Sequence, residues 1–412
     1  MVVIAPPDWA SGRPVDKQLQ LWPAIGRRLA FPDWSVAATH AAEGDAARDS
    51  LWPGVTAVQL PALTGLRAAA AGAVMLYHFR EVRPAIYWSF GIVDPIIRQA
   101  SVGVDVFFVL SGFVLCHVYG RTFSAGVLWR PYIDFLRNRL ARLYPIHLIT
   151  LAAMLALYAA GRTWFGIEPA NTESYTASSI AHNLLLTHAW FRGAGAPNTP
   201  AWSVSAEWFA YLFFPCLCVL TAHRSTYLII ALDAVMMVAA QTVGPLHPLL
   251  RVTTEFSVGV CTYMLVSRAG WRLVDSRAGA ALALAAFVGV MSLTGDPDHW
   301  LGVYTLLTTC LIVCLLNDRD ACARLFRTPV FVYLGEISYS LYMCHWLVWS
   351  IIKHSVTVAC PWFVGHAGAE IVLGVAATIF TAALTHRFVE LPWRRAMRST
   401  RLAPAVNSSA GS

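Results

Sequence analysis

From about residue 60 onward, the chain consists largely of apolar runs of roughly 16–22 residues that are separated by short polar breaks. An α-helix needs about 20 apolar residues to cross a bilayer, where its backbone has to satisfy its own hydrogen bonds. The sequence therefore predicts an all-α integral membrane protein, a bundle of about ten transmembrane helices. The expected spans are residues 62–79, 101–119, 143–160, 203–222, 226–243, 252–267, 278–294, 299–317, 330–352 and 368–388.

The composition supports this class. Apolar residues make up 57% of the chain and charged residues 13%, whereas soluble domains average about 45–50% and about 25%. These values argue against a nucleic-acid binder and against a disordered chain. Most of the nine cysteines lie in apolar runs and form no paired C-x-x-C motifs, so we expect neither a disulfide framework nor a metal site.

The distribution of basic residues predicts the orientation. If the N-terminus is cytoplasmic and ten spans follow, 23 of the 30 Lys and Arg residues fall in cytoplasmic segments. Because positive charge accumulates on the cytoplasmic side, both termini are expected there. Residues 1–58 lack a basic stretch followed by a long apolar run, so they are interpreted as an irregular cytoplasmic extension and not as a signal peptide. Residues 59–396 form the expected membrane domain, and residues 397–412 a flexible cytoplasmic tail.

Two ionisable residues share one face of the first expected span. Arg67 and His78 are eleven residues apart, about 20° from three full helical turns, with an axial separation of about 16 Å. An ionisable side chain inside a membrane span is costly, so it suggests a function. The alternative is an arginine that reaches the interface beside a histidine with a packing role.

Further polar residues are expected near the depth of His78, toward the outside. Asp105 is placed to orient and stabilise an imidazole, or to pair with some other donor. Glu207 and His345 belong to the same expected layer, where the alternatives are a helix-terminus carboxylate and an interfacial histidine. Ser203 and Ser205 begin the same span as Glu207, and Ser203 is also a plausible helix cap.

The inner side carries a different feature. Arg139 and Arg142 precede the third expected span at i, i+3, so they lie on one helical face. The guanidinium fork suits phosphate, although cytoplasmic arginines also follow simply from membrane topology. Asp233, in the middle of the fifth span, has no assigned role.

Five motifs occur together in a consistent order. They are Leu63–Arg67 with Arg67-x10-His78, Gly103–Phe113, Arg139-x-x-Arg142-Leu-Tyr-Pro145, Trp202–Glu207 and Leu334–Trp346, followed by a closing Val389–Trp393. This set resembles the acyltransferase-3 family of multi-pass membrane O-acyltransferases over about residues 59–396. The chain departs from the family pattern at Thr64, where Asp is common, and at Leu391, where a basic residue is common.

The resemblance implies transfer of an acyl group, usually acetyl from acetyl-CoA, to a hydroxyl of an extracytoplasmic glycan. Such acceptors include exopolysaccharide, lipopolysaccharide and lipid-linked sugars, and the location is the inner membrane of a bacterial cell. It implies functional positions at Arg67, His78, Arg139 and Arg142. His78, Asp105 and Glu207 are then the expected catalytic residues. The expected substrate-binding residues are Arg67, Arg139, Arg142, Ser203, Ser205 and His345.

In this hypothesis acyl-CoA is a co-substrate, no cofactor is permanently bound, and membrane lipid surrounds the domain. His78 acts as general base on the hydroxyl or forms a transient acyl-histidine. The alternative function is a transporter or flippase for a glycan or lipid-linked sugar, which would use the same charges as a substrate path. A catalytically inactive scaffold is disfavoured because the motif residues are intact.

Overall fold

The computed structural model describes residues 60–82, 90–166, 171–191, 193–222, 225–243, 247–269, 277–295, 297–353 and 366–397, and no strand occurs in these ranges. The expected extension at 1–58 lies outside them, as does the expected tail apart from Met397. The elements are α2 (Pro61–Val82), η4 (Gly91–Val93), α4 (Asp94–Arg98), η5 (Ala100–Val102), α5 (Gly103–Ser124), α6 (Trp129–Phe165), η6 (Thr172–Tyr175), α7 (Ala177–Leu184), η7 (Thr199–Ala201), α8 (Trp202–Ala222), α9 (Thr226–Val243), α10 (Pro248–Ala269), α11 (Gly279–Leu293), η9 (Pro297–Trp300), α12 (Leu301–Leu315), α13 (Ala321–Phe326), α14 (Pro329–Glu336), α15 (Ser338–Ile351), α17 (Ala367–Thr385), η12 (His386–Glu390) and α18 (Leu391–Met397).

The all-α prediction is confirmed for the described residues, and all ten expected spans coincide with helical segments. Among the described residues, six helical segments are long and apolar enough to cross a membrane, so the expected number of about ten is not established. The six are Ala100–Ser124, Trp129–Phe165, Thr199–Ala222, Pro248–Arg268, Pro297–Leu315 and Gly368–Met397. The ninth expected span is two helices, α14 and α15, divided at Ile337.

The segment between the second and third expected spans, residues 120–142, is helical in its second half. Helix α6 begins at Trp129 and runs for 37 residues through Pro145. The expected span began only at residue 143 because residues 129–142 include several basic and polar side chains and do not form an apolar run. The arginine pair 139/142 consequently lies on a rigid helix, which fixes the direction of both side chains.

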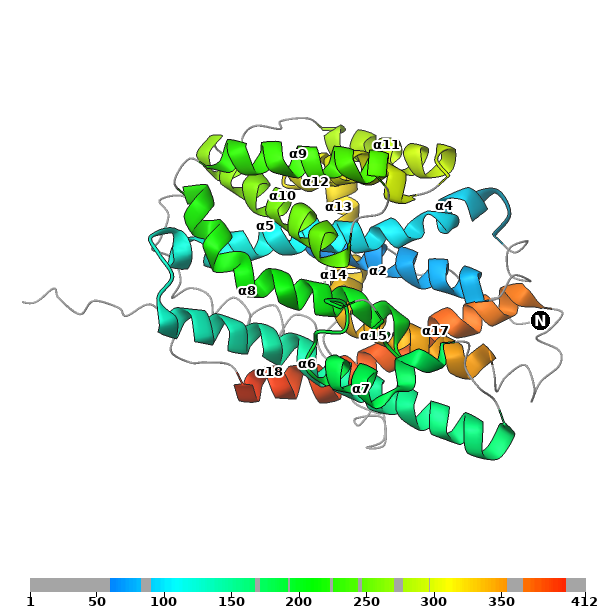
Figure 1. Ribbon diagram of the computed structural model, residues 1–412. Coiled ribbons are helices and arrows are strands. Elements are labelled where there is room, and N and C mark those ends of the chain that lie inside the picture. The colour runs from blue at the N-terminus through cyan, green and yellow to red at the C-terminus, as the bar shows by residue number, and fades with distance from the viewer. Residues whose placement is uncertain are drawn as a thin grey trace, which may run out of the picture. The chain divides into compact units, whose positions relative to one another are not determined.

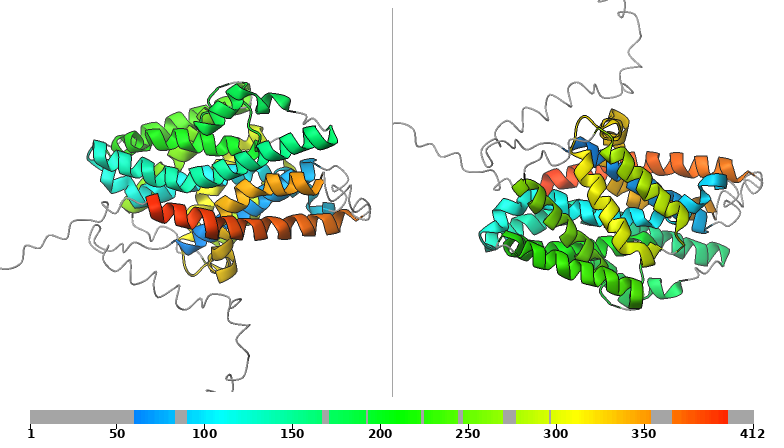
Figure 2. Two further views of the ribbon diagram at one scale, coloured as in Figure 1. Left: turned by 90° about the horizontal axis from the view of Figure 1, so that it is seen from below. Right: turned by 90° about the horizontal axis from the view of Figure 1, so that it is seen from above.

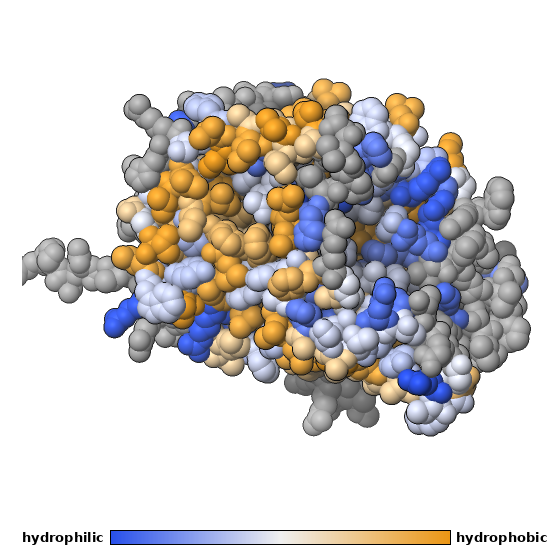
Figure 3. Space-filling model, viewed as in Figure 1, coloured by the Kyte–Doolittle hydropathy of each residue, from blue (hydrophilic) through white to orange (hydrophobic). Residues whose placement is uncertain are grey.

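The outward-facing surface of several helices is apolar. On α9, exposed apolar residues recur at Leu228, Leu232 and Val235, a spacing that places them on one helical face. Figure 3 shows apolar side chains gathered over α8 and α9, and hydrophilic ones at the right-hand end. Large apolar residues exposed in this pattern are typical of a surface in contact with lipid.

Helices α5 and α10 cross at very close range. A Cβ atom on Gly112 would collide with the carbonyl oxygen of Phe256, and one on Gly259 would collide with that of Val109. Small residues let helix backbones approach in this way within membranes. Gly112 and Gly259 therefore let the backbones of α5 and α10 pack directly against each other.

The remaining helices assemble around α2. Helix α2 packs against α5, α14 and α15, and α15 is covered in turn by α6 and α17. The helices run mostly along one direction (Figure 1), and α17 continues into α18 along the edge of the bundle (Figure 2, left). This arrangement brings residues from α2, α5, α6, α8 and α15 to one interior region.

Candidate active site

A cavity of about 80 Å³ occupies that interior region. Arg67, Arg139 and Arg142 line it together with Ser203 and Glu207. Five of the nine predicted site residues therefore meet at one place, from three different helices. The other lining residues are Val104, Phe107, Phe108, Leu110, Ser111, Val114, Leu115, Leu143, Val204, Tyr211, Ser338, Tyr339 and Tyr342.

Two of the three arginines, Arg67 and Arg139, lie against aromatic rings. The guanidinium of Arg67 lies 5.9 Å from the ring centre of Phe107, and that of Arg139 lies 5.3 Å from the ring of Tyr119. Arg139 also donates a hydrogen bond to the Tyr119 hydroxyl at 3.3 Å. In the part of the chain that the structure describes, the Nε atoms of Arg67 and Arg139 are buried without a hydrogen-bond partner. Buried cationic groups with spare donors are suited to an anionic ligand.

Glu207 does not lie in the layer expected for it. Its carboxylate accepts hydrogen bonds from the hydroxyls of Ser111 and of Tyr211, the latter at 2.5 Å, and it lines the cavity beside the arginines. Glu207 is five residues into α8, so it sits well over one helical turn beyond the start of that helix. The prediction that Glu207 lies at the same depth as His78 and His345 is wrong. Glu207 lies instead beside the arginines.

Ser203 and Ser205 have different surroundings. The Ser203 hydroxyl lies 2.8 Å from the Tyr342 hydroxyl and donates to the carbonyl of Pro200 at 3.1 Å, at the cavity wall. The Ser205 hydroxyl donates to the carbonyl of Leu186 and accepts from the backbone N–H of Ala189. Ser205 thus anchors the segment before α8 and does not line the cavity.

His78 and His345 form a direct pair. The Nε2 atom of His345 lies 3.2 Å from Nδ1 of His78, and the ring centres are 5.0 Å apart. The same Nδ1 atom lies 3.0 Å from the carbonyl oxygen of Val74. A carbonyl only accepts hydrogen bonds, so this contact requires the proton of His78 on Nδ1. The second ring nitrogen, Nε2, is then the one with a free lone pair.

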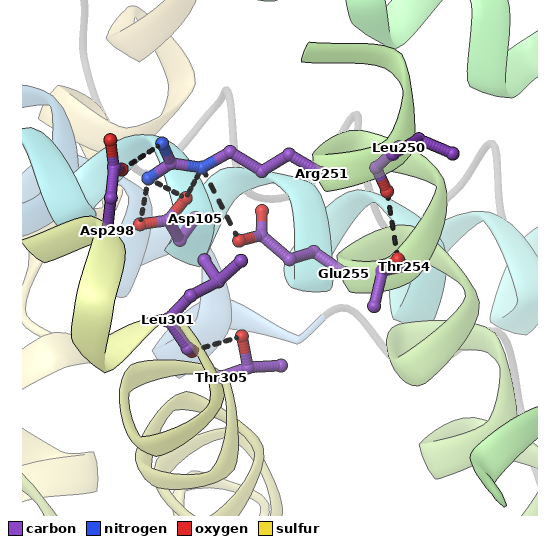
Figure 4. Close-up of polar contacts among 8 residues, drawn as sticks. All are labelled: Asp105, Leu250, Arg251, Thr254, Glu255, Asp298, Leu301 and Thr305. Atoms are coloured by element: carbon purple, nitrogen blue, oxygen red, sulfur yellow. Dashed lines mark hydrogen bonds and ion pairs between the residues drawn. The ribbon is translucent and has the colours of Figure 1, made fainter. Parts of the chain in front are cut away.

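Asp105 is not the partner of His78. Its two carboxylate oxygens accept hydrogen bonds from Arg251 at 2.8 and 2.9 Å, and Arg251 also binds Asp298 at 2.7 Å. Glu255 lies 3.7 Å from the same guanidinium (Figure 4). The expected role of Asp105 beside an imidazole is therefore replaced by its alternative, an ion pair with another donor. This cluster joins α5, α10 and η9.

Arg251 and Glu255 surround the predicted site residue Asp105, and the sequence had not predicted either of them. Arg251 was counted only as an external basic residue, yet it stands four residues before Glu255 at the edge of an apolar run. An i, i+4 arginine–glutamate pair at such an edge was the available signal. Asp233, left without a role, accepts hydrogen bonds from the Ser257 hydroxyl of α10 at 2.8 and 2.7 Å.

The closing motif connects to the histidine motif. Glu390 is buried and accepts hydrogen bonds from Ser340 at 2.9 Å and from His386 at 3.0 Å. Ser340 lies on α15, five residues before His345. The C-terminal motif thereby fixes the helix that carries His345.

The cavity and the histidine pair are neighbours separated by two aromatic rings. Phe107 and Tyr342 both line the cavity and pack edge to face at 6.1 Å. The Tyr342 ring also contacts the ring of His345 at 5.7 Å. Arg67 lines the cavity and His78 does not, and Tyr342 lies at the boundary because it lines the cavity and contacts His345.

Comparison with known proteins identifies the family. A family model described as an acyltransferase domain (Acyl_transf_3) matches residues 60–387. The chain belongs to the acyltransferase-3 family. It is 27% identical to the acyltransferase MdmB of Streptomyces mycarofaciens over 387 residues, covering 84% of this chain and 94% of that protein.

Two staphylococcal relatives are longer. A putative O-acetyltransferase of Staphylococcus aureus strain COL is 24% identical over 377 residues, and the O-acetyltransferase OatA of strain NCTC 8325 is 23% identical over 375. Each match covers 82% of this chain and 57% of the relative. No solved structure matches the chain. Membership of the family makes this acyltransferase-3 chain a membrane acyltransferase, and the transporter alternative is set aside.

Proposed function

We propose that this chain transfers an acyl group, namely acetyl, from cytoplasmic acyl-CoA to a hydroxyl group of an extracytoplasmic glycan. The observation that carries the proposal is the cavity in which Arg67, Arg139 and Arg142 gather, with Glu207 as the one carboxylate among its described lining residues. Three cations face one anion there, and the phosphates of acyl-CoA would supply the remaining negative charge. The glycan acceptor rests on the family resemblance alone.

His78 is proposed as the general base. With Nδ1–H held by the Val74 carbonyl and by His345, the Nε2 lone pair takes the proton of the acceptor hydroxyl as its oxygen attacks the thioester carbonyl. The carbon–sulfur bond then breaks, and the departing thiolate takes up the proton. His345 is proposed as a positioning residue that selects this tautomer, in place of the carboxylate expected at Asp105.

In this scheme the acyl group has to pass Tyr342. Its hydroxyl is tied to Pro200 and Ser203 at 2.9 and 2.8 Å, on the segment that leads into α8. Rotation of this ring would join the arginine-lined cavity to the histidine pair. Glu207, bound to Ser111 and Tyr211, balances part of the arginine charge when no donor is bound.

The test uses purified protein and labelled acetyl-CoA. His78→Ala should abolish acyl transfer while acetyl-CoA still binds, whereas Arg142→Ala should chiefly weaken acetyl-CoA binding. His366→Ala and Arg324→Ala are matched controls, because both side chains are exposed and neither lines the cavity. Normal transfer by His78→Ala, or unchanged acetyl-CoA affinity in Arg142→Ala, would refute the assignment concerned.

A further inference from the structure

Aromatic rings surround the imidazole of His78 on the sides that His345 leaves open. The Trp346 ring meets it edge to face at 5.4 Å and 83°, and the Tyr77 ring does so at 5.0 Å and 77°. The Tyr77 hydroxyl donates a hydrogen bond to the carboxylate of Glu81, one turn further along α2. A tryptophan, a phenol and a carboxylate are therefore grouped within about one helical turn of the proposed base.

Trp346 lies at the end of α15 that is less completely buried. Ten of the fourteen residues of α15 are buried, whereas Trp346 is partly exposed, as is Leu347 beside it. Trp349, less than one turn later, is buried and stacks on Phe79 at 4.2 Å. Within the described residues, the aromatic contact of Trp346 is with His78 alone.

Trp346 also lies on the cavity side of its helix. It follows Tyr342, which lines the cavity, by four residues, so the two side chains point in nearly the same direction. Interior helices cover α15 on the sides of α2, α6 and α17. A tryptophan of the membrane-interface belt would instead stand on a lipid-facing surface, away from the proposed base.

We propose that Trp346, Tyr77 and Glu81 form the acceptor subsite and that it takes a pyranose ring. The C–H groups on one face of a pyranose carry partial positive charge, and they pack on the negative face of an indole. Glu81 and the Tyr77 hydroxyl then bind sugar hydroxyls, and one further hydroxyl faces Nε2 of His78. This inference rests on the proposed function, and it adds the shape of the acceptor that the site selects.

The experiment compares three nucleophiles with the full-length protein and labelled acetyl-CoA. The probes are methyl β-D-glucopyranoside, the open-chain polyol sorbitol, and hydroxylamine, with the His78→Ala protein as the blank. The wild-type protein should acetylate the pyranoside faster than sorbitol. Trp346→Ala should lose about tenfold in kcat/KM for the pyranoside, consistent with the upper range of aromatic stacking, and less than twofold for hydroxylamine.

Matched variants separate binding from folding. Trp346→Phe retains a ring and should keep most of the pyranoside activity, and Trp393→Ala removes a half-exposed tryptophan of α18 and should change neither reaction. Equal losses with all nucleophiles in Trp346→Ala, or no preference for the pyranoside over sorbitol in the wild type, would overturn the subsite. Transfer to the pyranoside by His78→Ala above the level seen without protein would instead overturn the proposed function, so the two failures are distinguishable.

Discussion

Arg251→Ala should be among the most destabilising single substitutions in this protein. Arg251 binds Asp105 through two hydrogen bonds, Asp298 through one, and lies 3.7 Å from Glu255. Asp105 and Glu255 are 1% and 0% exposed, so the substitution leaves two buried carboxyl groups without their cation. Breaking a buried ion pair by removing one partner costs about 3–5 kcal/mol.

The measurement is thermal unfolding in detergent, followed by the fluorescence of the 16 tryptophans. At about 2 °C per kcal/mol, Tm should fall by roughly 6–10 °C. Asp105→Asn is the informative companion, because it leaves Arg251 with Glu255 and Asp298 and should cost much less. If Asp105 were instead a catalytic residue, Asp105→Asn would abolish acyl transfer and leave Tm unchanged. That result, or a stable Arg251→Ala protein, would refute the structural assignment.

Three further outcomes follow from the contacts. His345→Ala should lower kcat about tenfold, the effect of one lost hydrogen bond on the proposed base, while the KM for acetyl-CoA stays unchanged in steady-state assays. Gly112→Leu should prevent close packing of α5 on α10, which a lowered Tm and a reduced yield of folded protein would report; a wild-type Tm would contradict the close approach. The guanidinium of Arg80 holds the pKa of Asp94 below its usual range, so the stability from this pair is present above the unfolded pKa and is lost as pH falls through the folded one. Asp94→Asn should flatten that acidic decline in Tm.

The sequence predicted well those features that depend on local chemistry. Each of the ten apolar runs coincided with helical structure, and the i, i+3 spacing placed Arg139 and Arg142 on one face. The eleven-residue spacing likewise placed Arg67 and His78 on one side of α2. These predictions need only the period of a helix, so they hold without knowledge of the tertiary packing.

The errors concern distances between helices. Depth along a span was taken as a measure of proximity, which grouped Asp105 and Glu207 with the histidines. In the structure Arg251 of α10 takes Asp105, and Glu207 faces the arginines. Which carboxylate pairs with which cation depends on how each helix is rotated and on close helix crossings such as the one at Gly112. Neither can be read from the spacing of residues within one helix. The start of the 37-residue helix α6 was misjudged for a local reason, because residues 129–142 include several basic and polar side chains and do not form an apolar run.

The division between the cavity and the histidine pair bears on how a thioester is protected from water. If the arginine-lined cavity opened directly onto His78, a base poised for a sugar hydroxyl would equally activate water at the thioester. Tyr342 stands at the boundary and contacts His345, and its hydroxyl is tied to Pro200 and Ser203. The segment that holds Tyr342 is itself anchored by Ser205 to residues 186–189. An acceptor that binds next to Trp346 contacts the same face of α15, so it is well placed to shift this ring. The arrangement thus favours an order in which acceptor binding joins the two compartments, and donor hydrolysis stays slow until then.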